Sequence, residues 1–150
     1  MVNENPKNYD PRMHSAEHIL NQTMVRLFNC GRAFSAHIEK KKSKCDYHFT
    51  RNLTDEEKAD IEKRVNEVIH SNAPVTESFI NRDEASKEFS LARLPEEATD
   101  LLRIIQIGNY DKCLCSGVHI SNTKEIGDFK IISTDFNNDA LRIRFKLINE

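Results

Sequence analysis

Two stretches of the chain carry apolar side chains every three or four positions, the spacing that places them along one face of an α-helix. The first covers residues 13–29, and Gly31 follows it where a helix commonly ends. The second follows Thr54, whose side chain can cap a helix while Glu57 completes a capping box. We therefore expect an amphipathic helix over residues 13–29 and a second one from Thr54 to about residues 71–74.

Apolar and polar side chains alternate in other stretches, which is typical of strands with one buried face. The clearest example is Cys45, Tyr47 and Phe49, in the second arm of an expected hairpin. The expected strands are 32–39, 44–50, 75–80, 101–107, 110–115, 129–135 and 141–147, with a turn at 137–139. A short helix is expected to start at 81–84, before a break at 94–95. Since strands and helices do not alternate regularly, the pattern predicts an α+β fold with helices packed on a mainly antiparallel sheet.

The length of 150 residues is typical of a single domain. The chain starts with a polar segment containing two prolines, so residues 1–12 are expected to form a flexible lead-in and residues 13–150 one domain. No apolar run approaches the roughly 20 residues needed to span a bilayer, and the first residues show no signal-peptide pattern. The sequence therefore predicts a cytoplasmic protein with no membrane contact.

The composition is that of a globular protein, with 38% hydrophobic and 31% charged residues, and it limits the chemistry to be expected. A net charge of −2 predicts no general attraction to nucleic acid, so a contact with tRNA or DNA needs a local basic patch. In the reducing cytoplasm, the four cysteines are expected to serve as ligands or core residues and not as disulfides.

Two short motifs near opposite ends of the chain carry side chains that bind metals. His14 and His18 lie four positions apart on the first expected helix, so their rings project from the same face. Cys115 and His119 lie at the end of an expected strand, with Gly117 between them to allow a tight bend. Zinc prefers imidazole and thiolate donors, and four of them suit one tetrahedral ion. Each pair alone also fits a simpler interpretation, as hydrogen-bonded or solvated histidines and a cysteine packed as a small apolar residue.

Glu17 lies inside the first motif but does not make it a metalloprotease signature. In that signature, H-E-x-x-H, the glutamate directly follows the first histidine, whereas Glu17 directly precedes His18. At this position Glu17 is expected to point to a different side of the helix from the metal. We therefore interpret it as a solvated helix residue and not as a general base.

Five stretches form an ordered series that covers nearly the whole chain, from about residue 13 to residue 147. They are residues 14–20 (H-x-x-x-H), 45–49 (similar to R-x-D-F), 65–75 (V-N-x-x-I-x-x-N-x-P-V), 115–120 (C-x-G-x-H-I) and 122–131 (N-T-x-E-I-G-x-F-K-I). This series resembles the second additional domain shared by alanyl- and threonyl-tRNA synthetases. It is most similar to the free-standing alanyl editing relatives of that domain, often called AlaX.

The resemblance implies hydrolysis, without ATP, of the ester that joins a wrong amino acid to tRNA. The N-T-x-E-I-G segment resembles the alanyl branch, whose members remove serine or glycine from alanine tRNA. By this resemblance a cleft for the aminoacyl-adenosine end of the tRNA has zinc (Zn2+) at its floor, held by His14, His18, Cys115 and His119. The metal can polarise the ester carbonyl, orient the substrate amino group or lower the pKa of a water molecule, and the sequence does not choose among these. We assign catalysis to His14 and to His119, the latter as general base if it does not bind the metal.

The chain also departs from the pattern of these relatives. It starts close to the H-x-x-x-H helix, so we expect it to lack the glycine-rich barrel of the longer members. Cys113 stands where threonyl-type members carry aspartate, and it shares a strand face with Cys115, so it can lie near the metal. Val118 stands where many relatives have threonine or proline, a change that can alter the amino-acid preference.

The residues expected to contact the substrate and the tRNA are assigned from their places in the first hairpin and in the C-x-G-x-H motif. Ser35, His37 and Gly117 are expected to line the substrate pocket, although His37 also fits an ordinary strand histidine. The basic run at the hairpin is expected either to contact tRNA phosphates or to be a solvated turn, and it consists of Lys40, Lys41, Lys42 and Lys44. A homo-oligomer is compatible with the sequence, which does not reveal the oligomeric state. Two other functions stay open, a non-catalytic tRNA-binding or interaction domain with structural zinc, and a zinc hydrolase for another small ester or amide.

Overall fold

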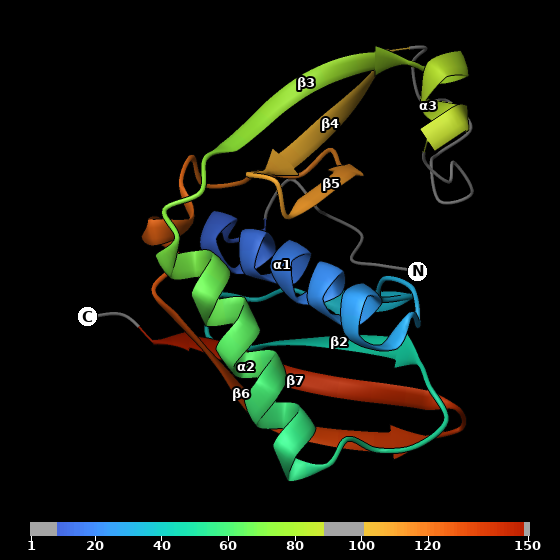
Figure 1. The fold of residues 1–150 in the computed structure, drawn as a ribbon, viewed down its shortest axis with the longest axis vertical. Coiled ribbons are helices and arrows are strands. Elements are labelled where there is room, and N and C mark those ends of the chain that lie inside the picture. The colour runs from blue at the N-terminus through green and yellow to red at the C-terminus, as the bar shows by residue number, and fades with distance from the viewer. Residues whose placement is uncertain (1–8, 89–100, 149–150) are drawn as a thin grey trace.

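The computed structural model describes residues 9–88 and 101–148 (Figure 1). Its first element is helix α1 (Pro11–Phe28), which begins two residues earlier than predicted. The start is fixed by Asp10, whose side chain accepts hydrogen bonds from two backbone N–H groups of the first turn, at 2.9 and 3.3 Å. Residues 9–12 therefore belong to the fold and not to a flexible lead-in.

A four-stranded antiparallel sheet forms one side of the molecule, with the strand order β1-β2-β7-β6. Its strands are β1 (Ser35–His37), β2 (Ser43–His48), β6 (Asp128–Asn137) and β7 (Ala140–Ile148). Strand β2 buries Cys45 and Tyr47, as the alternation predicts. The predicted turn between β6 and β7 is confirmed, since Asn138 and Asp139 have the positive φ angles of a tight hairpin turn, 51° and 62°.

Helices α1 and α2 (Asp55–His70) lie against this sheet (Figure 1). The predicted capping box of α2 is confirmed, because the backbone N–H of Glu57 donates to the Thr54 hydroxyl (3.1 Å) and the Glu57 carboxylate accepts from the Thr54 N–H (2.9 Å). The helices and the sheet share one core, whose larger members include Met13, Ile19, Leu20, Met24, Tyr47, Ile61, Ile69, Phe129, Ile143 and Phe145. Burial of these apolar side chains is the main force that holds the two layers together.

A second antiparallel sheet lies on the other side of α1 (Figure 1). Its order is β3-β4-β5, with β3 (Val75–Asn81), β4 (Leu101–Ile107) and β5 (Asp111–Leu114). Helix α3 (Arg82–Glu88) packs against β3 and β4, and a short 3-10 helix (Thr123–Glu125) precedes β6. The predicted α+β class is thus confirmed, but the strands form two sheets and not one.

The predicted break at residues 94–95 lies outside the described residues. Within residues 9–88 and 101–148, no helix combines the length and the apolar character needed to cross a membrane.

Candidate metal centre

Four potential metal donors meet between α1 and the loop that follows β5. His14 and His18 come from α1, while Cys115 and His119 come from the loop. Their ligand atoms all lie within 4.8 Å of one another. The sulfur of Cys115 is 3.5 Å from Nε2 of His14 and 3.5 Å from Nε2 of His119. The structure thus brings together the four residues that the sequence assigns to a metal, and this cluster could hold a metal ion.

The loop is held in place by two arginines that the sequence analysis did not single out. Arg103 of β4 donates hydrogen bonds to the carbonyl oxygens of Cys115 (3.2 Å) and Gly117 (2.6 Å). Arg12, in the first turn of α1, donates to two carbonyl oxygens in the segment after the loop, at 2.9 and 2.7 Å. Arg103 binds the start of the loop and Arg12 binds the segment after it. These hydrogen bonds hold Cys115 and His119 in position beside α1.

Two of the histidines use Nδ1 for a hydrogen bond within the protein. Nδ1 of His14 donates to the carbonyl oxygen of Val118 at 3.0 Å. Nδ1 of His119 lies 2.9 Å from the hydroxyl oxygen of Ser15, on the same helix as His14. These contacts orient the rings so that both Nε2 atoms face the sulfur of Cys115, an arrangement usual for zinc-binding histidines. The donor set therefore fits zinc in both ligand type and ring orientation.

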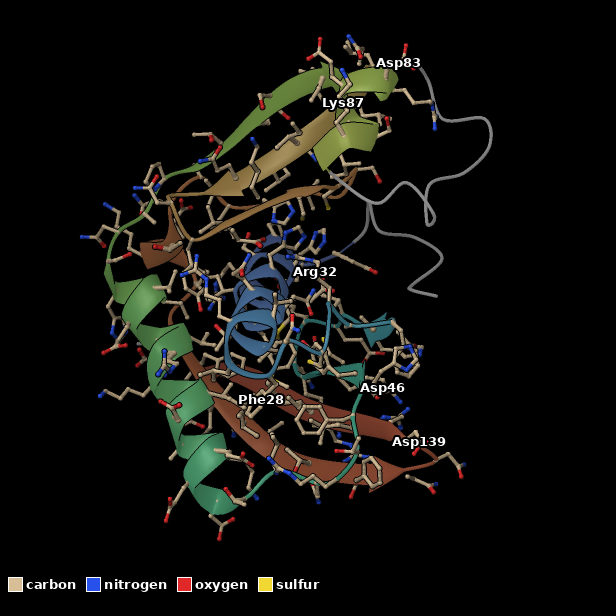
Figure 2. The ribbon with its side chains drawn as sticks, turned by 45° about the vertical axis from the view of Figure 1, so that its right-hand side comes forward. Phe28, Arg32, Asp46, Asp83, Lys87 and Asp139 are labelled. Carbon is tan, nitrogen blue, oxygen red and sulfur yellow. The ribbon has the colours of Figure 1, made fainter. Side chains whose placement is uncertain are left out.

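His18 is oriented by a buried group of polar side chains. Its Nδ1 is 3.2 Å from the sulfur of Cys113 and 3.5 Å from a carboxylate oxygen of Asp111. Asp111 is 3% exposed and accepts hydrogen bonds from Arg32 (2.7 and 3.2 Å) and from Gln22 (2.9 Å). Arg32 lies beside α1, on the side of the three-stranded sheet (Figure 2).

His18, Asp111 and Cys113 also form a second possible donor group. The guanidinium of Arg32, however, already neutralises the carboxylate of Asp111. A cation bound there would lie beside the positive charge of Arg32. We therefore interpret the group as the support that orients His18. The sequence contained one indication of it, Cys113 on the strand face of Cys115, while Asp111 and Arg32 were missed.

The protonation states of Cys115 and His119 suit a bound cation. Burial raises the pKa of the Cys115 thiol, but hydrogen bonds from the three imidazoles outweigh burial and lower it to about 2. Burial lowers the pKa of His119 to about 4, so its ring is neutral at pH 7. Burial alone would also lower the pKa of His18, yet Cys113 and Asp111 together raise it. The lowered pKa values favour a thiolate at Cys115 and a neutral imidazole at His119, the forms that coordinate metals.

Glu17 lies in a different environment from the one predicted. It is 8% exposed, and one carboxylate oxygen lies 3.7 Å from Nε2 of His14. The other oxygen accepts a hydrogen bond from the side chain of Asn21 at 3.4 Å. The prediction of a solvated residue on another side of the helix is therefore wrong. Residues three apart share a helix face, and α1 is buried between two sheets.

The residues predicted to contact substrate and tRNA lie apart from the donors, except for Gly117 in the loop. Ser35 is half-buried and His37 is exposed, both on the face of β1 opposite to the buried Ala36. The turn after β1 exposes three lysines, and β2 holds a fourth that is half-buried: Lys40, Lys41, Lys42 and Lys44. Within the part of the chain that the structure describes, we find no hydrogen bond, ion pair or ring contact between these side chains and the four donors. Their assignments stay predictions.

Comparison with known proteins finds similarity to aminoacyl-tRNA synthetases. Residues 102–143 match the family described as threonyl and alanyl tRNA synthetase second additional domain. Over 133 residues, 88% of the chain, the sequence is 34% identical to the alanine–tRNA ligase of Fervidobacterium nodosum. The alanine–tRNA ligases of Neisseria gonorrhoeae and Halalkalibacterium halodurans are 32% and 33% identical over 88% and 89% of the chain. The chain is a relative of this synthetase domain.

This relationship confirms the resemblance seen in the sequence to the second additional domain of alanyl- and threonyl-tRNA synthetases. The chain spans about 15% of the length of the curated relatives it matches. The range matched by the family includes Cys115 and His119, but it does not include α1 with His14 and His18. The pairing of the loop with His14 and His18 therefore rests on the geometry of the centre.

Proposed function

We propose that the chain hydrolyses the ester bond of mischarged alanine tRNA and releases serine or glycine at a zinc centre held by His14, His18, Cys115 and His119. The observation that carries the proposal is the convergence of these donors, with ring nitrogens oriented by hydrogen bonds within the protein. The relationship to alanine–tRNA ligases supports the substrate class. Such an activity belongs to translation in the cytoplasm.

When bound, zinc would supply a positive charge that polarises the ester carbonyl. His119 is half-buried and neutral at pH 7, and Ser15 holds its Nδ1. When His119 is not a ligand, its Nε2 can take a proton from the water that attacks the ester carbon. The bond from this carbon to the tRNA oxygen then breaks, and the proton passes from His119 to this departing oxygen, which becomes the free hydroxyl of the tRNA. His14, oriented by the hydrogen bond from its Nδ1 to the carbonyl oxygen of Val118, would take part in catalysis by holding the zinc through Nε2.

The rest of the substrate is assigned to the first hairpin and to the loop. We propose that Ser35 and His37 contact the amino acid, with Gly117 leaving room for it. The phosphates of the tRNA would contact the basic run Lys40, Lys41, Lys42 and Lys44. Binding of alanine tRNA should then weaken as the salt concentration rises. A plot of the logarithm of the association constant against the logarithm of the salt concentration should become less steep when these lysines are replaced by glutamine.

Deacylation of serine-, glycine- and alanine-charged alanine tRNA tests the proposal. We expect release of serine or glycine, retention of alanine, and about one zinc per chain by metal analysis. Cys115→Ala removes the thiolate and is expected to abolish both zinc retention and release. Cys30→Ala is the matched control, because Cys30 is half-buried and outside the donor cluster. A folded, zinc-containing protein that releases no amino acid would overturn the proposal.

A non-catalytic tRNA-binding or interaction domain is the second candidate. It is favoured by the donor set itself, since four protein donors close a tetrahedral zinc site. In this case charged tRNA should bind without losing its amino acid, and Cys115→Ala should lower thermal stability. Binding and release measured on the same charged tRNA separate the two candidates.

A further inference from the structure

One face of the three-stranded sheet continues outward from the metal centre. Cys113 of β5 points to His18, so the face that carries Cys113 is the face toward the centre. Cys113 is paired with Ile105 on β4, and Ile105 is paired with Glu77 on β3. Side chains directly opposite each other in antiparallel strands share a face. These three residues therefore form one row on the side of the centre.

The next row on this face contains a metal donor and an aromatic ring. The N–H of Cys115 donates to the carbonyl oxygen of Arg103 (3.1 Å), and Arg103 is paired with Phe79 on β3. The side chain of Arg103 reaches both Glu77 and the carbonyl oxygen of Cys115, which places it on this face as well. Phe79 thus projects on the side of the centre, two strands from Cys115. Neighbouring strands lie about 4.8 Å apart, so the two residues are about 10 Å apart across the sheet.

Phe79 is highly exposed for an aromatic side chain, at 57%, and its diagonal neighbour Leu101 is exposed at 59%. Val118, in the donor loop, is exposed at 40%. Among the described residues, the other two exposed large hydrophobic side chains, Ile132 and Ile148, belong to the four-stranded sheet. Exposed apolar side chains beside a polar donor cluster are typical of a site whose ligand has an apolar part and a polar part.

We propose that Phe79 and Leu101 form a stacking platform for the terminal adenosine of the tRNA while the ester lies at the donor cluster. The inference rests on the proposed deacylase function and names the part of the substrate that this face would hold. The ion pair with Glu77 balances the charge of Arg103, so the face is neutral and suits an uncharged purine. A nucleoside is long enough to reach from Phe79 to Cys115, a distance of about 10 Å across the sheet. Stacking on aromatic side chains is a common way to hold the bases of single-stranded ends.

The chain has no tryptophan, so Phe79→Trp introduces a single fluorescent reporter on the platform. Adenosine 5′-monophosphate should quench this reporter with saturation, because the indole stacks on adenine, and cytidine 5′-monophosphate should quench it less. Ile132→Trp is the matched control, since Ile132 is 45% exposed on the other sheet. It should show only linear collisional quenching. Equal quenching curves for the two variants would overturn the platform.

Deacylation gives a second measurement. Phe79→Ala should lower kcat/KM by about 5- to 150-fold, mainly through KM, as expected for the loss of one base–aromatic stack. Phe79→Tyr should retain most of the activity, and Ile132→Ala should leave it unchanged. Unchanged kcat/KM in Phe79→Ala would contradict the platform. So would a dimer that Phe79→Ala dissociates in size-exclusion chromatography, because a second copy would then cover this face.

The two experiments separate the platform from the deacylase function. The fluorescence titration requires no catalysis and no charged tRNA. In one outcome, adenosine 5′-monophosphate quenches Phe79→Trp with saturation while the wild-type protein releases no amino acid. That result would support the platform and overturn the deacylase proposal. Release of serine or glycine by the wild type, without saturable quenching of Phe79→Trp, would support the deacylase proposal and overturn the platform.

Discussion

The two sheets of this protein serve different purposes. The four-stranded sheet turns alternate side chains into a continuous apolar core under α1 and α2, with Phe129 and Phe145 fully buried. The three-stranded sheet places polar groups toward the centre instead, among them Arg103 and Asp111. Stability and chemistry thus depend mainly on different layers of the molecule, and α1, which lies between them, contributes to both.

A matched pair of phenylalanines, one from each sheet, tests this division with the largest expected effect. Phe145 is fully buried and packs on Phe129 with ring centroids 5.1 Å apart, whereas Phe79 is mostly exposed. Phe145→Ala should lower the free energy of unfolding by about 3–5 kcal/mol, because it leaves a cavity in the core. Phe79→Ala should change it by less than about 0.5 kcal/mol. Urea denaturation at fixed zinc measures both, and similar losses in the two variants would contradict the division.

Two aspartate–arginine pairs provide the next test. Asp111→Asn should weaken zinc binding by about 10- to 100-fold, because the neutral amide can no longer pair with Arg32 and support His18. Asp46 forms a similar pair with Arg142, at 2.8 and 3.0 Å, on the four-stranded sheet. Asp46→Asn should leave the zinc affinity unchanged. Competition with a chromogenic chelator measures both affinities, and an unaltered affinity in Asp111→Asn would remove the supporting role of Asp111.

The helix cap of α2 predicts a smaller effect, confined to stability. Thr54→Ala should lower the free energy of unfolding by about 1 kcal/mol, since the N–H of Glu57 loses its hydroxyl acceptor. Thr54→Ser retains the hydroxyl and should remain close to the wild type. Zinc affinity should be the same in all three proteins. A change in zinc affinity would show that α2 and the centre are coupled.

The smallest expected effect depends on pH. Hydrogen bonds from Arg51 and from the backbone of Thr54 lower the pKa of Glu57 from 4.5 to about 2. Because the folded-state pKa is depressed, the contribution of Glu57 to stability is present above about pH 4.5 and is lost as the pH falls towards 2. The difference in unfolding free energy between the wild type and Glu57→Gln should therefore shrink over this range. Urea denaturation at several pH values measures it, and a constant difference would show that the Glu57 carboxylate adds nothing.

Local patterns were sufficient for most of the fold. The capping box at Thr54, the burial of Cys45 and Tyr47 in β2, and the turn at Asn138 and Asp139 each depend on residues close in sequence, and all are confirmed. The start of α1 was placed two residues late because the cap by Asp10 was not recognised. The division of the strands into two sheets was missed because strand periodicity does not specify pairing partners.

For the candidate site, the donor types and their spacing follow from the order of residues in the chain. His14 and His18 share a face because a helix turns once in 3.6 residues, and Cys115 and His119 are joined by a short loop. The orientation of these donors and the charges around them depend on contacts between distant parts of the chain. The contacts of Asp111 with His18 and Arg32 join residues that lie 93 and 79 positions apart, and such contacts form only when the two sheets close on α1. No local pattern carries that information.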